Sequence, residues 1–257
     1  MSELLDLALH LADLADSITS DGFSSRDFDV SRKGDATEVT TIDRAAETAL
    51  REVVTARRPS DGFYGEEHGR VNPDSRLQWV VDPIDGTSNF VRGVPVWATL
   101  IALVDDDSPV IGVVSAPALG RRWWGEKGSG AFANGRQIRV SDVTSLEDAH
   151  VSITHSRGWN DLGLGPRLVD LQSRAKRSRG FGDFWQHMLV AEGAIDVAID
   201  AIGLQPYDNA ALYPIVTEAG GTISDRFGAS DWRSNSQITT NGMLHNVVMS
   251  LVREVQQ

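Results

Sequence analysis

Two aspartates lie three residues apart in the segment 82–88, which reads DPIDGTS and follows an apolar run over 77–81. Pro83 fixes its own φ angle and restricts the residue before it, so the turn that carries Asp82 and Asp85 is stiff. Carboxylate oxygens that converge in this way are the hard ligands that Mg²⁺ prefers, together with waters and phosphate oxygens. A surface turn with a capping aspartate is the alternative, but proline, glycine and threonine in this order behind an apolar strand favour a metal site.

The residues that follow Asp85 add the features of an anion site. Gly86 lets the backbone approach a ligand closely, because it has no side chain. If a helix begins here, the backbone N–H groups of Gly86, Thr87 and Ser88 are available to a phosphate group. We therefore expect one segment to supply metal ligands and also the surroundings of a phosphate, through Asp85, Gly86 and Thr87.

Two adjacent acids, Glu66 and Glu67, follow a short strand-like segment in the sequence GEEHG over 65–69. Neighbouring side chains on an extended segment point in opposite directions, so only one of the two acids can face a given metal. The other would accept hydrogen bonds in the outer shell. An acidic surface loop is the alternative for this segment alone, and its combination with the segment 82–88 favours the metal role.

Asp208 and Asp43 each have a structural role that competes with a chemical one. Asp208 precedes an expected helix over 210–219, where it would be the N-cap, but a free carboxylate oxygen there could also reach a metal. Asp43 follows Thr40 at the spacing of a capping box, and the local sequence favours this role. The catalytic alternative has Asp43 bonded to the hydroxyl of Thr87, which then orients a water molecule.

Composition excludes several other classes of function. The 257 residues are 41% hydrophobic and 23% charged, which is typical of a globular chain with a sizeable core. The net charge of −12 argues against a nucleic-acid-binding surface. The chain has no cysteine nucleophile, no P-loop and no GxSxG motif. Without a long apolar run or a basic leader, we expect no membrane segment and a cytoplasmic location.

The pattern of strands and helices indicates an α+β chain. Apolar spacing predicts helices over 3–18, with Gly22 just beyond, and from residue 40 or 41 to 57. Strands are predicted over 77–81, 97–104, 109–115, 121–126 and 130–132, the second and third as a hairpin. Later strands are predicted over 151–154, 197–199, 222–224 and 237–240, and helices within 161–176 and over 183–193, 210–219 and 245–252. Pro214 would cost the helix over 210–219 about 3 kcal/mol unless that helix starts late or kinks.

Four motifs resemble the inositol monophosphatase family: GEE at 65–67, WVVDPIDGTSNF at 79–90, DNAA at 208–211 and EAGG at 218–221. The stretch 33–47 matches more loosely, and together the motifs cover most of the chain. The resemblance implies an αβαβα layered sandwich, a homodimer, and magnesium-dependent hydrolysis of a small phosphorylated metabolite that Li⁺ inhibits. We place a boundary near 135–145, between an N-terminal subdomain (1–140) with most metal ligands and a C-terminal subdomain (141–257) with the substrate contacts and Asp208.

The resemblance also implies a ligand set for two or three Mg²⁺ ions, with Mn²⁺ as a substitute. Glu66, Asp82 and the carbonyl of Ile84 would hold the first ion. Asp82, Asp85 and Asp208 would hold the second, and Glu66 would also touch a third.

The catalytic residues implied by the family are Asp43, Glu66 and Thr87. Thr87 with Asp43 would help to activate a water molecule, which attacks phosphorus directly while bound cations neutralise charge on the oxygens. No covalent intermediate is required.

Two stretches look like the actinobacterial histidinol-phosphate phosphatases of this family. They are FVRGVPVWA at 90–98 with SAPA at 115–118, and GDF at 182–184 with VAEGA at 190–194. This resemblance implies that Asp183 faces the leaving alcohol, where a carboxylate could pair with the cationic amine or imidazole of histidinol; a helix N-cap is the alternative. Asp200 is also assigned to the substrate, although the segment 196–208 looks one residue longer than in the family and Tyr207 replaces its usual tryptophan.

Two other functions stay open at this point. A phosphatase for inositol 1-phosphate, or more broadly for sugar or nucleotide phosphates, is the alternative within enzymes. A metal-dependent binding protein without turnover is the more remote one, and the presence of Asp43 and Thr87 argues against it. The sequence thus predicts a phosphomonoesterase, with histidinol phosphate as the expected substrate.

Overall fold

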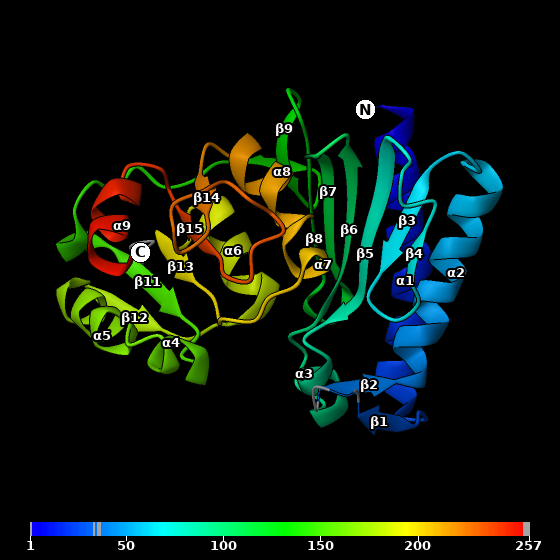
Figure 1. The fold of residues 1–257 in the computed structure, drawn as a ribbon, viewed down its shortest axis with the longest axis horizontal. Coiled ribbons are helices and arrows are strands. Elements are labelled where there is room, and N and C mark those ends of the chain that lie inside the picture. Colours follow the sequence, from blue (N-terminus) through cyan, green and yellow to red (C-terminus); the bar gives the residue numbers. More distant parts are fainter. Residues whose placement is uncertain (1, 33, 35–36, 254–257) are drawn as a thin grey trace.

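The computed structural model describes residues 2–32, 34 and 37–253. Residues 33, 35 and 36, which belong to the loosely matching stretch 33–47, lie outside the described residues. Two β-sheets alternate with helices in stacked layers (Figure 1). Within the described residues, no helix is long and apolar enough to cross a membrane.

The larger sheet has eight strands in the order β10-β9-β8-β7-β6-β5-β3-β4. Neighbours are antiparallel except for β3 and β5, which are parallel. The hairpin predicted from 97–104 and 109–115 is confirmed as β6 and β7. The strands are β3 (Gly62–Gly65), β4 (Gly69–Val71), β5 (Leu77–Asp85), β6 (Ala98–Asp105), β7 (Ser108–Ala116), β8 (Arg121–Glu126), β9 (Gly130–Ala133) and β10 (Arg136–Ile138).

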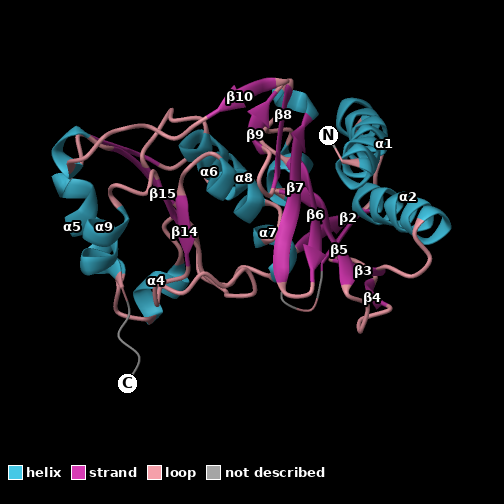
Figure 2. Ribbon diagram, turned by 90° about the horizontal axis from the view of Figure 1, so that it is seen from above, coloured by secondary structure: helices cyan, strands magenta, loops and turns pink. Residues whose placement is uncertain are grey.

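Helices α1 (Glu3–Ser25) and α2 (Thr41–Arg57) cover one face of the larger sheet (Figures 1 and 2). Leu11 and Leu50 pack there against Trp79 of β5. The predicted bounds of α2 are confirmed, whereas α1 continues past residue 18 and includes Gly22. A Cβ at Gly22 would lie 2.7 Å from the side chain of Ile42, so glycine serves close helix packing here and does not end the helix.

Helices α6 (Asp183–Ala191) and α8 (Leu212–Glu218) cover the opposite face and separate the two sheets. Phe184 and Ile215 pack against residues of the larger sheet, including Trp123. Val190 of α6 packs instead against Ala198 of the smaller sheet. The middle helical layer therefore contributes to the cores on both of its sides.

The smaller sheet has five strands in the order β12-β11-β13-β15-β14. Its strands are β11 (His150–Ile153), β12 (Arg177–Arg179), β13 (Val197–Ile199), β14 (Thr222–Ser224) and β15 (Ile238–Thr240). Helices α4 (Arg157–Asp161), α5 (Gly165–Arg174) and α9 (His245–Val252) cover its outer face. The layers run helix, sheet, helix, sheet, helix, so the predicted αβαβα sandwich is confirmed.

A few short elements complete the fold. β1 (Val30–Arg32) and β2 (Glu38–Thr40) form a two-stranded ribbon beside α3 (Thr87–Arg92), as Figure 1 shows. Two single 3₁₀ turns span Pro117–Leu119 and Leu146–Asp148. The larger sheet ends at Ile138 and the smaller begins at His150, and the division into 1–140 and 141–257 stays a prediction.

Two predicted boundaries near the chemically interesting residues were wrong. β5 does not stop before Asp82 but continues to Asp85, because a bulge between them accommodates Pro83 in the strand. The single helix predicted over 210–219 is instead α7 (Pro206–Asn209) followed by α8. Pro214 lies in the first turn of α8, where its missing N–H leaves no helical bond unmade.

Candidate active site

The bulge in β5 carries Asp82 and Asp85. The side chain of Asp82 is 2% exposed, and its Oδ1 accepts a hydrogen bond from the N–H of Ile84 at 2.9 Å. The carbonyl of Pro83 accepts from the buried hydroxyl of Thr99 on β6 at 2.8 Å. Bonds on both sides of the bulge therefore hold the two aspartates in place.

Glu66 reaches the same region from the turn between β3 and β4. β3 ends at Gly65 and lies parallel to β5, so this turn begins beside the strand that carries Asp82. Glu66 lines one cleft with Asp82, whereas Glu67 lies near Arg44 of α2, with 4.0 Å between Oε2 and Nε. The neighbouring acids thus take different directions, as an extended backbone requires.

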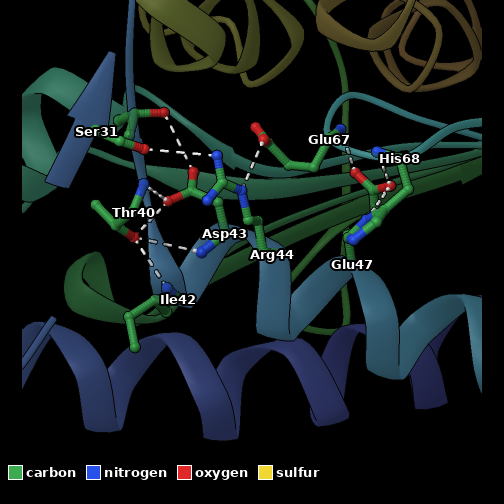
Figure 3. A network of polar contacts seen from close by, with 9 residues as sticks. Ser31, Thr40, Ile42, Asp43, Arg44, Glu47, Glu67 and His68 are labelled. Atoms are coloured by element: carbon green, nitrogen blue, oxygen red, sulfur yellow. Dashed lines mark hydrogen bonds and ion pairs between the residues drawn. The ribbon is translucent and has the colours of Figure 1, made fainter. Parts of the chain in front are cut away.

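A buried carboxylate on α2 supports this turn. Glu47 Oε2 accepts from the backbone N–H of Glu67 at 2.6 Å, and Oε1 accepts from that of His68 at 2.8 Å (Figure 3). Oε1 also lies 3.0 Å from Nδ1 of the His68 ring. The turn that bears Glu66 is therefore tied to α2 by three contacts.

Thr87 connects α3 with α2. Its hydroxyl lies 2.9 Å from the carbonyl oxygen of Ile84 and 3.4 Å from Oδ1 of Asp43. Asp43 also forms the capping box that was predicted with Thr40, whose N–H donates to Oδ2 at 2.9 Å. The capping box is thereby confirmed, and the contact with Thr87 is compatible with the catalytic role, which stays a prediction, because the two oxygens of Asp43 serve different partners. Gly86 is the N-cap of α3 and has a φ angle of 83°.

Asp183 lies at the start of α6 and, like Asp200, is not among the residues that line the cleft. The N-cap of α6 is Gly182, so the N-cap interpretation of Asp183 was wrong. Asp183 instead adopts a φ of 47°, and its Oδ2 accepts from the side-chain amide of Asn89 at 3.1 Å. The next residue, Phe184, donates its N–H to Oδ2 of Asp85 at 2.8 Å. The start of α6 is therefore bonded to both β5 and α3.

Asp208 enters the site from α7. It was expected to be an N-cap, but Gln205 holds that place and Asp208 is the third residue of the helix. Its Oδ2 accepts from the N–H of Gln205 at 2.7 Å. Tyr207 lines the cleft and contacts Tyr64 edge-on, with ring centroids 5.9 Å apart.

Asp200 follows β13 and is 5% exposed. Its Oδ2 lies 3.0 Å from Nε2 of His187 on α6, and its Oδ1 accepts from the N–H of Ala201 at 2.7 Å. Nδ1 of His187 lies in turn 2.8 Å from the hydroxyl of Thr239. Both oxygens of Asp200 therefore have protein partners, which any direct contact with a substrate would have to share.

Three of the predicted acids converge on one point. One carboxylate oxygen each from Asp82, Asp85 and Asp208 lies within 4.8 Å of the others. The cleft around them measures about 520 Å³ and also contains the other predicted metal ligands, Glu66 and Ile84, and the predicted phosphate contacts Gly86 and Thr87.

The pKa values of the acids at this site are raised by burial and by their neighbours' charges. Burial raises the pKa of Asp82 and of Asp85 well above the usual range, and the charges of Glu66 and Asp183, respectively, raise it further. Burial raises the pKa of Asp208 to about 7, against the lowering effect of the bond from Gln205. It likewise raises the pKa of Asp43 and of Asp183 to about 6.

This donor set fits a divalent cation. The carboxylates are close enough to repel one another, and their raised pKa values reflect that cost together with desolvation. All the converging donors are oxygen atoms, which suits Mg²⁺ or Mn²⁺ better than metals that favour sulfur or imidazole ligands. A bound cation would offset the repulsion, so the site matches the predicted type of metal.

Sequence reasoning missed several residues that hold the site. Glu47 appeared only within the loosely matching stretch 33–47, although its position four residues after Asp43 on α2 places both on one helix face. Asn89 had no assigned role, and neither did His187. Asp183 lies 94 residues from Asn89, and Asp200 lies 13 residues from His187 on a different element, so no local pattern could have identified these two contacts.

Comparison with known proteins gives a consistent family. The model of the inositol monophosphatase family matches residues 1–257. The chain is 45% identical over 251 residues to the histidinol-phosphatase of Mycobacterium tuberculosis, covering 96% of both chains. It is 42% identical over 259 residues to the histidinol-phosphatase of Streptomyces coelicolor, covering 97% of both.

A solved structure agrees with these relatives. The extragenic suppressor protein suhB from Bartonella henselae superposes with a TM-score of 0.91 at 30% identity, covering 99% of this chain and all of that one. The resemblance inferred from the four motifs is thereby confirmed, and the chain belongs to the inositol monophosphatase family.

Proposed function

We propose that this protein is a magnesium-dependent phosphomonoesterase that hydrolyses L-histidinol phosphate to L-histidinol and phosphate. The convergence of Asp82, Asp85 and Asp208 beside the start of α3 is the observation that carries the phosphatase activity. Similarity over nearly the full length to two histidinol-phosphatases supports the choice of substrate. Histidine biosynthesis is the pathway that this reaction serves.

Two or three Mg²⁺ ions complete the site in this proposal. Glu66, Asp82 and the carbonyl of Ile84 hold one ion, Asp82, Asp85 and Asp208 hold another, and Glu66 contributes to a third. When bound, such cations neutralise phosphate charge and lower the pKa of water. Substitution by Mn²⁺ and inhibition by Li⁺ stay predictions from the family resemblance.

The chain's own contribution to water activation centres on Thr87. Its hydroxyl has one proton and two acceptors within reach, the carbonyl of Ile84 and Oδ1 of Asp43. If the carbonyl of Ile84 holds a metal, it is no longer available to the Thr87 hydroxyl. The hydroxyl proton of Thr87 would then be donated to Oδ1 of Asp43. The lone pairs of the Thr87 oxygen can then accept a hydrogen bond from the attacking water and orient it toward phosphorus.

The phosphate group would lie at the start of α3. The N–H groups of Gly86 and Thr87 are available there to equatorial oxygens, and the net charge of −12 of the whole chain makes such local donors necessary. Direct attack by water then releases the alcohol without a covalent intermediate.

Recognition of histidinol is assigned to Asp183 and Asp200. Histidinol carries a cationic amine and an imidazole, and a carboxylate close to Asp85 and Gly86 can pair with either of them. The Asn89 amide and the start of α6 hold Asp183 in place for this purpose. A neutral polyol such as inositol gains no ion pair there, so the same site would favour the cationic substrate.

Several finer expectations belong to this proposal as well. A homodimer and a cytoplasmic location rest on the family resemblance and the sequence, and size-exclusion chromatography with light scattering tests the former. The predicted division at 135–145 would make residues 1–140 the source of most metal ligands and residues 141–257 the source of the substrate contacts and Asp208.

Phosphate release tests the proposal directly. Purified protein is assayed with Mg²⁺ and with EDTA, using histidinol phosphate and inositol 1-phosphate side by side. We expect Mg²⁺-dependent release with a large preference for histidinol phosphate. A preference for inositol 1-phosphate would keep the reaction and overturn the substrate, whereas no release from either would favour other phosphorylated substrates or a binding protein without turnover.

A further inference from the structure

Glu47 is the most completely buried acid beside the cleft that the proposed reaction does not use. Its side chain is 0% exposed, and it lies four residues after Asp43 on the buried face of α2. A carboxylate without solvent is costly unless hydrogen bonds satisfy it. Two backbone N–H groups and one ring nitrogen do so here, and all three belong to Glu67 and His68.

The residue on the other side of Glu66 is shaped by the same carboxylate. A Cβ added to Gly65 would lie 2.2 Å from the carboxyl carbon and Oε1 of Glu47. No side chain can therefore occupy position 65 while Glu47 keeps its place. Glu47 thus contacts the backbone immediately before Glu66 by close approach, and the backbone immediately after it by hydrogen bonds.

We propose that Glu47 is a positioning residue that holds the turn 65–68 so that Glu66 faces the carboxylates of Asp82, Asp85 and Asp208. α2 then serves the site twice: Asp43, near its start, contacts Thr87. Glu47, one turn later, binds the backbone of Glu67 and His68 (Figure 3). This inference rests on the proposed metal-binding function but not on the identity of the substrate.

Metal binding is the readout that separates positioning from mere stability. Glu47→Gln keeps the shape of the side chain but sets an N–H₂ group against one of the backbone N–H donors. Outer-shell changes of this kind cost about tenfold to a hundredfold in metal affinity, and we expect a Mg²⁺ or Mn²⁺ dissociation constant raised by that factor in titration calorimetry. At saturating Mg²⁺, KM for histidinol phosphate should change by less than about threefold, because Glu47 does not line the substrate side.

The matched control is Glu52→Gln, on the exposed face of the same helix. It should leave metal affinity and turnover unchanged. A purely structural role for Glu47 would lower the melting temperature of the metal-free protein and leave the metal dissociation constant as in wild type. That result would overturn the proposal. Should Glu47→Gln not fold, His68→Ala removes only the ring contact, and an unchanged metal dissociation constant in that variant would count against the proposal equally.

A double-mutant cycle tests the close approach at Gly65. Gly65→Ala alone should weaken metal binding by about tenfold or more, because the new methyl group displaces Glu47 or the turn. In the Glu47→Ala background the same substitution should cost less than about twofold, since the space is then vacant. Equal costs in both backgrounds would contradict the coupling. Metal binding is measured without substrate, so this test does not depend on the proposed reaction. A wild-type protein that binds Mg²⁺ but releases no phosphate would refute the proposed function, and the double-mutant cycle would still test the positioning role of Glu47.

Discussion

The two sides of the cleft are built in different ways. One side, which we call the sheet side, takes its acids from strand β5 and the adjoining β3–β4 turn: Glu66, Asp82 and Asp85. The other, which we call the helix side, comprises Asp208 of α7, which lines the cleft, and two acids that do not line it, Asp183 at the start of α6 and Asp200 after β13. Strand pairing and a bulge fix the first set, whereas helix starts and contacts between distant residues fix the second.

This difference suggests a division of labour. The sheet side is held by strand pairing and by Glu47 on α2, which suits ligands that must keep a constant geometry. The acids of the helix side lie outside the strands, at helix starts and just after β13, where changes of sequence can alter the substrate without disturbing the strands. We therefore expect changes on the sheet side to abolish turnover of every substrate, and a change at Asp183 to alter the choice between substrates.

The largest effect is expected for Asp85→Asn. Loss of this ligand should lower kcat by about a thousandfold or more for histidinol phosphate and inositol 1-phosphate alike, since metal contributions of several kcal/mol are at stake. The fold should persist, and the metal-free variant should melt at a higher temperature than metal-free wild type, because a buried charge is removed. Retained turnover would refute the metal assignment, and the exposed Asp74→Asn serves as the control.

A smaller and selective effect is expected for Asp183→Asn. Removing a charge-assisted contact should lower kcat/KM for histidinol phosphate by about tenfold to a hundredfold, while that for inositol 1-phosphate stays nearly constant. Measuring both substrates with one enzyme preparation checks this ratio. An equal loss for both would mean that Asp183 serves the common chemistry, and the contrast between the two sides would not hold.

The smallest effect is a pH dependence of the metal-free protein. The folded-state pKa values of Asp208, about 7, and of Asp43 and Asp183, about 6, lie above the value near 3.9 of an unfolded chain. Their protonated forms therefore stabilise the fold below about pH 4, and this contribution is lost as the pH rises through 6 to 7. The melting temperature without metal should fall by a few degrees between pH 5.5 and pH 8.

Added Mg²⁺ should reverse this trend, because it stabilises the ionised carboxylates. The rise in melting temperature on adding Mg²⁺ should thus be larger at pH 8 than at pH 5.5. A stabilisation by Mg²⁺ that is independent of pH would show that Asp208, the one proposed metal ligand among these three acids, does not bind the metal.

The sequence predicted the sheet side better than the helix side. The DPIDGTS segment combines proline, glycine and paired acids within a few residues, so its chemistry can be recognised locally, even though β5 continues further than expected. Asp208 was identified, but its place within α7 was not, because Gln205 as N-cap is an unusual choice. The positive φ of Asp183 depends on contacts with Asn89 and β5 that only the tertiary fold supplies.

Most elements of the layered fold were also predictable, because their signals lie within single segments of the sequence. Short apolar runs and helical spacing predicted most strands and helices, whereas Gly22 was misread because its close packing against Ile42 involves a second helix. The same limit applies to Gly65 and Glu47. The role of neither residue can be recognised from its own segment, because that role depends on the contact between α2 and the turn 65–68.

Crystals grown with Mn²⁺ test the central claim most directly, through the anomalous scattering of the metal. We predict density for a metal between the two sides of the cleft, bound by Asp82 and Asp85 from the sheet side together with Asp208 from the helix side. A metal bound by only one side, or none at this point in a protein that hydrolyses histidinol phosphate with Mn²⁺, would contradict the account.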